Sequence, residues 1–224
     1  MCLDYNKIEI ETIKRKIVGK VTDLSKTIFR IDPLLENLPQ VSRSASALQS
    51  IKISHGSWIE QSLKVFIRAI PGWESEINVK LSVKGKITEI DNIAYNSSTN
   101  TVVLWECKRQ WETLDNDKVN IVSQRFKFLE THKTQLEAEI LRNIGIKPKT
   151  IDMVVFNCWG KSKDWPKNVK EYKIYCRDEI GQLFGPCLWE CIQFHKEYII
   201  HTMSDLLGLE KNNNLEGNPF FKSL

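Results

Sequence analysis

The sequence lacks the features that would place the protein in a membrane. None of its apolar runs approaches the length of about 20 residues needed to cross a bilayer, and the N-terminus has no basic region followed by an apolar one. We therefore expect a cytoplasmic protein with no membrane partner. At 224 residues and 42% hydrophobic content, the chain can bury one good core, so one compact domain overall is expected.

Cysteine and histidine are scattered in a way that favours no metal site built from them. The six cysteines stand mostly in apolar segments, where a free thiol behaves as a small hydrophobic side chain, and disulfides are not needed. Cys187 and Cys191 are one helical turn apart, but no second cysteine pair has ligand spacing. His195 and His201 do not match the helical spacing of zinc ligands.

The net positive charge is also small. The net charge is only +4, which permits a nucleic-acid ligand without demonstrating one. A basic stretch surrounds Trp165. A charge run of this kind usually forms a solvated loop. The alternative is a surface that follows a nucleic-acid backbone, formed by Lys161, Lys163, Lys167 and Lys170.

What the chain does contain is the apolar patterning of an α/β protein. An apolar stripe over residues 10–28 predicts a helix in an N-terminal extension, residues 1–50, which packs on its own domain or forms a homodimer interface. A crossover helix predicts a mixed sheet with a right-handed connection. The expected elements are a helix over 57–70 stopped by Pro71-Gly72, a strand over 79–83, a long helix over about 115–143 with Gly145 near its end, a strand over 151–156 covered on both faces, a strand over 172–177 and a closing helix over 188–207.

Two neighbouring segments predict a strand hairpin that carries charged residues. Residues 86–95 and 101–108 are rich in strand formers, and the polar cluster between them has turn chemistry. Side chains alternate across a strand, so Glu106 and Lys108 leave one face. If Asp91 points the same way, two carboxylates and an ammonium converge in an oxygen-rich pocket suited to magnesium or manganese. The alternative is a surface ion pair beside a solvated acid.

These residues also follow the order of a known family motif. Glu60 on a helix, Asp91 on a strand and Glu106-Cys107-Lys108 on the next strand together resemble the PD-(D/E)xK nuclease superfamily, with Ile90 in place of the usual proline. Gln124 to Phe128 is similar to the Q-x-x-x-Y element of its RecB-like branch, with Phe in place of Tyr. The resemblance covers roughly residues 55 to 157. It implies a three-layer α/β/α restriction-endonuclease-like core with a mixed sheet, within residues 51–224, and helical N- and C-terminal additions.

The resemblance further implies an endonuclease that hydrolyses DNA phosphodiester bonds and leaves 5′-phosphate ends. Mg²⁺ or Mn²⁺ would be held by Asp91, Glu106 and the backbone carbonyl of Cys107. Lys108 would orient water or neutralise the phosphate. Glu60 would be an accessory carboxylate and a further metal ligand, although a solvated surface glutamate is an equal alternative. The rim residues Gln124 and Arg109 would contact the nucleic-acid backbone, and Gln124 could also bond to water on the metal.

Three alternatives stay open at the level of sequence. The same fold could serve an exonuclease or an RNA-directed nuclease. A DNA-binding or assembly protein with a vestigial nuclease site is the third, although the intact Asp91, Glu106 and Lys108 argue against it. No iron–sulfur cluster is expected, because the cysteine arrangement of the RecB-like nucleases that carry one is missing.

Overall fold

The computed structural model describes residues 56–108, 116–159, 172–176, 179 and 197. The chain divides into two compact units, and the sheet lies in the one that comprises Met1–Leu3 and Ile59–Trp189. The predictions for residues 1–50, for Arg109, for the basic stretch around Trp165 and for most of the closing helix lie outside the described residues. No described helix is both long and apolar enough to cross a bilayer.

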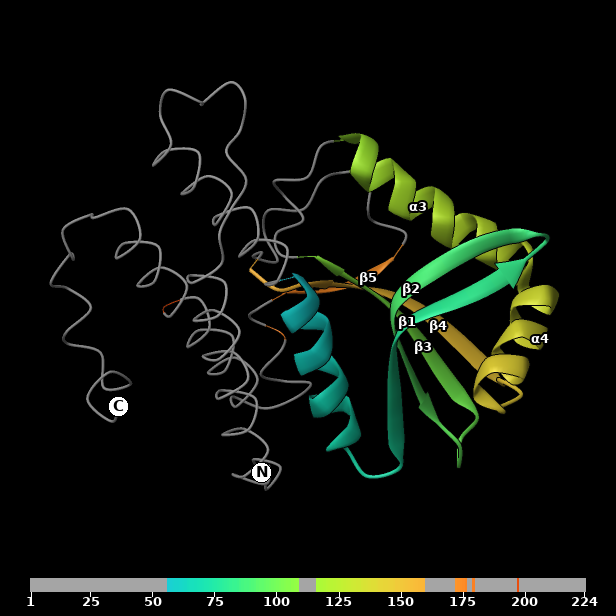
Figure 1. The fold of residues 1–224 in the computed structure, drawn as a ribbon, viewed down its shortest axis with the longest axis horizontal. Coiled ribbons are helices and arrows are strands. Elements are labelled where there is room, and N and C mark those ends of the chain that lie inside the picture. Colours follow the sequence, from blue (N-terminus) through green and yellow to red (C-terminus); the bar gives the residue numbers. More distant parts are fainter. Residues whose placement is uncertain (1–55, 109–115, 160–171, 177–178, 180–196, 198–224) are drawn as a thin grey trace, which may run out of the picture. The chain divides into compact units, whose positions relative to one another are not determined.

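A five-stranded mixed sheet forms the centre of the described unit (Figure 1). The strands lie side by side in chain order. The first three are antiparallel, and the last two join in parallel. The mixed α/β class predicted from the sequence is thus confirmed for strands β1 (Trp73–Val83), β2 (Lys86–Asn96), β3 (Thr101–Lys108), β4 (Thr150–Asn157) and β5 (Lys173–Cys176).

The predicted hairpin is confirmed as β2 and β3. Its turn is organised by the Asn96 side chain, whose Oδ1 accepts hydrogen bonds from Ser98 N at 3.0 Å and Thr99 N at 3.2 Å. This is the local side-chain bonding that favours asparagine in turns. Asn100 closes the turn with a positive φ of 54°, which asparagine tolerates better than most residues.

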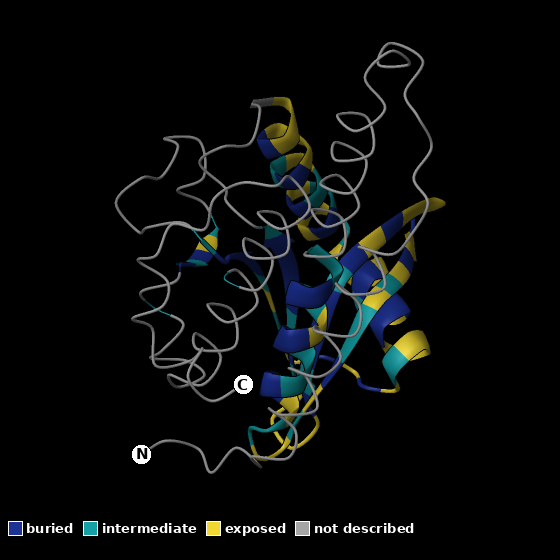
Figure 2. Ribbon diagram, turned by 60° about the vertical axis from the view of Figure 1, so that its left-hand side comes forward, coloured by how far each residue is buried: buried dark blue, intermediate teal, exposed yellow. Residues whose placement is uncertain are grey.

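Helices lie on both faces of the sheet (Figure 1, Figure 2). Side chains of α3 (Asn116–Thr131) and α4 (Lys133–Ile144) join Val102 and Leu104 of β3 in one buried cluster. The alternate residues Val103 and Trp105 face a helix over residues 56–68 instead. The described unit therefore has the helix–sheet–helix order typical of α/β proteins.

The single long helix predicted over 115–143 is wrong, because the chain breaks at His132. His132 has φ −112° and ψ 40°, outside the helical region, and its ring packs on Phe128 with centroids 4.6 Å apart. Both helices share one buried cluster on the sheet, but only α3 also contributes Phe126 to a second cluster with β4 and β5, whereas α4 packs on β1. Gly145 ends α4 in the left-handed conformation, as expected for a C-cap glycine.

Strand β4 also departs from its prediction of burial on both faces. Its second half, from Val154 to Asn157, is buried, but Thr150 and Asp152 are exposed. Asp152 is exposed because it lines a cavity on the sheet face opposite α3 and α4.

Candidate active site

The site is built where β2 changes direction. The β1–β2 ladder skips the pair Asn78 and Asp91, Asn78 has φ 54°, and the β2–β3 ladder ends at Asn92↔Trp105. Ile90 and Ile93 then join the same buried cluster, which strict strand alternation would not allow. Asp91 therefore lies at a bend, with its backbone paired in neither ladder.

The Asp91 carboxylate takes the place of the missing ladder bond. Its Oδ2 accepts a hydrogen bond from the backbone N–H of Cys107 at 2.7 Å. Beside it, the buried Asn92 side chain accepts a hydrogen bond from Ser75 Oγ at 2.9 Å, which ties β2 to β1 next to the bend. The bend thus directs a carboxylate onto the end of β3, where Glu106 and Lys108 stand.

Three oxygens converge on the Lys108 ammonium. Its Nζ lies 2.5 Å from Glu106 Oε1, 3.2 Å from the Cys107 carbonyl oxygen and 3.5 Å from Asp91 Oδ2. These are the oxygens that the sequence predicted as metal ligands. The predicted convergence of two carboxylates and an ammonium is therefore present, and it includes the backbone carbonyl.

Glu106 is buried and has a second cation. It is 2% exposed, and its other oxygen, Oε2, accepts a hydrogen bond from Arg125 Nη1 of α3 at 2.5 Å. The same nitrogen lies 3.4 Å from the Glu89 carbonyl oxygen, so Arg125 connects α3 to both β2 and β3. Burying a carboxylate is costly unless each oxygen is paired, and both oxygens of Glu106 are.

Arg125 was missed by the sequence interpretation, which named its neighbour Gln124. Gln124 is exposed, and within the described part of the chain no hydrogen bond joins it to the carboxylates. A weak signal existed, because Arg125 flanks the apolar stripe of Val122, Phe126 and Leu129, whereas Gln124 stands on the opposite side of the helix. A role for Gln124 remains a prediction.

Glu60 belongs to the electrostatic neighbourhood of the cluster. Burial is the main reason that its pKa rises to about 7. The carboxylates of Asp91, Glu106 and Glu89 also raise this pKa, and the Lys108 ammonium opposes them. Near neutral pH, Glu60 therefore exchanges a proton readily.

Lys108 and Cys107, unlike Glu60, both keep their protons near neutral pH. Burial lowers the pKa of Lys108, but the adjacent Glu106 and Asp91 carboxylates outweigh it, so the pKa is raised and Lys108 stays a cation. Burial raises the pKa of the Cys107 thiol well above its usual range. A thiolate nucleophile is therefore disfavoured, and Cys107 contributes through its backbone groups.

No group of three or more His, Cys, Asp or Glu side chains in residues 56–108, 116–159 and 172–176 is arranged as a metal site. The oxygens around Lys108 are a different set, with two carboxylates and one carbonyl. All three are hard ligands of the type that Mg²⁺ and Mn²⁺ prefer, and they already face a single cation. The donor chemistry therefore fits such an ion, provided that the ammonium withdraws.

No protein-family model matches the chain, and no curated protein does. A solved crystal structure of a protein of unknown function, AF1548, is similar over 68% of this chain and 99% of its own, at 12% identity and a TM-score of 0.35. A likeness at this level supports no conclusion about fold family or function.

Proposed function

We propose that the protein is a metal-dependent endonuclease that hydrolyses DNA phosphodiester bonds. The observation that carries this proposal is the convergence of Asp91, Glu106 and the Cys107 carbonyl on one cationic position at the end of β3. The order of Glu60, Asp91 and Glu106-Cys107-Lys108 along the chain, which resembles the PD-(D/E)xK nucleases, supports it. A restriction-endonuclease-like core is part of the same proposal.

In this proposal Asp91, Glu106 and the Cys107 carbonyl would hold Mg²⁺ or Mn²⁺. When bound, the ion would supply Lewis-acid chemistry, stabilising negative charge on the phosphate and making water a better nucleophile. Lys108 would neutralise the phosphate or orient the attacking water. Arg125 keeps the Glu106 carboxylate in place from the α3 side.

Glu60 is suited to proton transfer. With a pKa of about 7, it can accept the proton that water loses as its oxygen bonds to phosphorus. The bond from phosphorus to the 3′ oxygen breaks, and that oxygen takes up a proton from solvent or a protonated group. The products are a 5′-phosphate and a 3′-hydroxyl, and no redox partner is needed.

A supercoiled circular DNA is the most informative substrate for testing the proposal. We expect purified protein with Mg²⁺ or Mn²⁺ to convert the circle to nicked and linear forms, and a chelator to stop the reaction. Attack on linear ends with circles left intact would indicate an exonuclease instead. Cleavage of RNA alone would indicate the RNA-directed alternative.

One observation favours a second candidate, a DNA-binding or assembly protein. Both oxygens of Glu106 are already satisfied by Lys108 and Arg125, so the cluster is a complete ion-pair network as it stands. Such a network can be purely structural. Binding of DNA without cleavage under any divalent metal would support this candidate and contradict the endonuclease proposal.

A further inference from the structure

The pairing of β1 with β2 extends beyond the end of the β2–β3 ladder. The β2–β3 ladder ends at Asn92↔Trp105, whereas β1 stays paired with β2 as far as Val83↔Lys86. Residues 79–90 therefore form a two-stranded ribbon with no third described strand beside it. We call this ribbon the arm. Figure 1 shows it bending away from the rest of the sheet toward α3 and α4.

The root of the arm adjoins the candidate active site. Glu89 accepts a hydrogen bond from Arg125 through its carbonyl oxygen, and its carboxylate raises the pKa of Glu60. Asp91 follows directly after the last residue of the arm. Any ligand whose reacting group reaches Asp91 therefore passes close to this ribbon.

One face of the arm is anchored to the helices. Leu81 and Val83 are fully buried in the cluster with α3 and α4, and Ser82 donates its backbone N–H to Glu139 of α4 at 3.4 Å. At the tip, the Lys86 ammonium lies 5.1 Å from the centroid of the Phe128 ring. These contacts hold the ribbon in place without using its other face.

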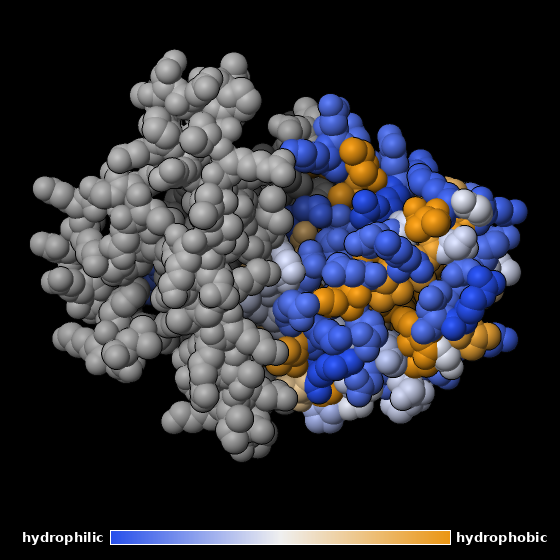
Figure 3. Space-filling model, in the orientation of Figure 1, coloured by the Kyte–Doolittle hydropathy of each residue, from blue (hydrophilic) through white to orange (hydrophobic). Residues whose placement is uncertain are grey.

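The other face and the tip are exposed and basic. The other face carries Lys80 and Lys84 against a single acid, Glu89, whose carboxylate is 4.0 Å from Lys80, and Lys86 at the tip is exposed as well as packed on Phe128. Ile87 is 69% exposed, the largest exposure of any described large apolar side chain. Figure 3 shows such apolar groups interrupting an otherwise hydrophilic surface. An exposed isoleucine among lysines does nothing for the core.

The turn of the arm holds a lysine where the fold would prefer another residue. Lys84 has φ 50° and Gly85 has φ 74°, so both central residues of this two-residue turn are left-handed. Turns of this kind favour Asn, Asp or Gly at the first position, because a Cβ is strained there. Stability does not account for Lys84, whereas contact with an anion would.

We propose that the arm enters the major groove of double-stranded DNA bound at the candidate active site, an inference that rests on the proposed function and names duplex as its substrate class. A two-stranded ribbon is one of the few protein shapes that this groove admits. The strand from Lys86 to Asp91 spans about 17 Å, half of the ~34 Å helical repeat of the duplex. Lys80 and Lys84 would contact phosphates, and Ile87 would face the base edges, where thymine offers a methyl group.

The test is a substitution that weakens the contact without harming the turn. Lys84→Asn removes the charge and suits the left-handed position, so its melting temperature should equal or exceed that of the wild type. We expect weaker binding of the full chain to a labelled duplex about three helical turns long, measured by anisotropy in metal-free buffer. The loss should be about eightfold at 0.1 M salt, with a log–log salt slope lower by about 0.9, the value of one duplex phosphate contact.

Lys147→Asn is the matched control. Lys147 is exposed in the loop before β4, close to the β2–β3 turn and at the opposite end of β3 from Lys108. Its substitution should change neither affinity nor slope. Ile87→Ser should weaken duplex binding with the slope unchanged, because no charge is lost. Equal binding by Lys84→Asn and Lys147→Asn, or an equal loss of binding to single strands and duplex, would overturn the inference.

The same measurements separate this inference from the proposed function. Duplex binding that depends on Lys84, together with no metal-dependent cleavage by the wild type, would overturn the nuclease proposal and leave the arm as a duplex-binding element. Cleavage by the wild type, together with duplex binding that is indifferent to Lys84 and Ile87, would overturn the arm inference alone.

Discussion

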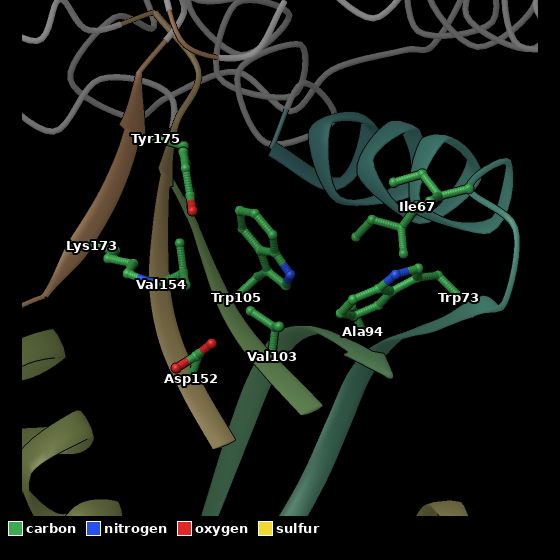
Figure 4. A pocket seen from close by; sticks show the side chains of 10 residues that line it. Ile67, Trp73, Ala94, Val103, Trp105, Asp152, Val154, Lys173 and Tyr175 are labelled. Atoms are coloured by element: carbon green, nitrogen blue, oxygen red, sulfur yellow. The ribbon is translucent and has the colours of Figure 1, made fainter. Parts of the chain in front are cut away.

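The two sides of β3 create opposite environments one residue apart. Trp105 is 6% exposed and faces a cavity of about 240 Å³. Trp73 and Tyr175 also line this cavity (Figure 4). Glu106 leaves the other side of the strand and meets Lys108 and Arg125. Strand alternation alone is enough to separate an apolar lining from an ionic cluster.

The difference shows which side serves the fold. Aromatic and aliphatic contacts, such as the Trp105 and Tyr175 rings 5.6 Å apart, stabilise a protein in proportion to the apolar area they bury. A buried ion pair is weak evidence for stability, since the cost of desolvating Glu106 offsets much of the attraction to Lys108 and Arg125. Changes on the ionic side should therefore affect chemistry first, and changes on the apolar side should affect stability first.

The largest expected effect is on the ionic side. Glu106→Gln keeps the shape of the side chain and removes its charge, so it should lower metal-dependent cleavage by about 10²-fold or more. Asp91→Asn and Lys108→Met should do the same. Cleavage of supercoiled DNA at saturating metal is the measurement, and the far-ultraviolet dichroism spectrum is the control for folding. Undiminished cleavage by Glu106→Gln would remove this residue from the site.

Arg125 should give the next largest effect, because it acts through Glu106. Arg125→Ala frees Glu106 Oε2 and should lower cleavage by about tenfold. It should also change the metal concentration needed for half-maximal rate, because a competing cation has gone. Arg125→Lys should recover part of both effects. Gln124→Ala, one position away and exposed, is the control, and an equal loss there would show that α3 is merely disturbed.

A feature of this arrangement is predictable from the sequence when it depends only on residues that are close together in the chain. The hairpin of β2 and β3 is predictable because strand formers flank a turn organised by Asn96. The grouping of Glu106 with Lys108 follows from alternation within one strand. Both predictions need only neighbours in the chain, and both hold.

The features that were missed depend on distant partners. Arg125 meets Glu106 only because α3 is rotated about its axis so that Arg125 faces β3. The apolar stripe of α3 specifies this rotation poorly. The bend at Asp91 depends on Asn78 of β1, whose positive φ leaves no mark in the apolar pattern. The break at His132 lets α3 reach β4 and β5 through Phe126 while α4 packs on β1. Tertiary packing overrides local propensity in each of these cases.

Glu60 offers a smaller, pH-dependent effect. Its folded pKa of about 7 lies above the ordinary value of 4.5, so the folded protein binds more protons than the unfolded chain between these values. Stability should therefore fall as the pH rises through this window and stay level above it. Allowing for solvent screening of a half-buried group, the loss should be about 1–2 kcal/mol.

Glu60→Gln should remove that loss, which denaturant unfolding at pH 5 and pH 8 measures. The same variant should lower the cleavage rate and flatten the increase of that rate with pH near pH 7, because the proton acceptor has gone. Glu130→Gln, an exposed acid of α3, is the control. A wild-type stability that rises between pH 5 and pH 7, with Glu60→Gln behaving alike, would contradict the raised pKa.

The smallest effect on cleavage should come from the apolar side of β3, at Trp105, although this residue is next to Glu106 in the sequence. Trp105→Phe keeps an aromatic ring against Phe156 and Tyr175 but leaves part of the volume unfilled beside an existing cavity. We expect a loss of about 1–2 kcal/mol in the free energy of unfolding. The cleavage rate well below the melting temperature should stay within about twofold of wild type, because the Glu106 side of the strand is untouched. A large drop in cleavage with little loss of stability would show that the cavity takes part in binding DNA, and the separation of the two faces of β3 would then be wrong.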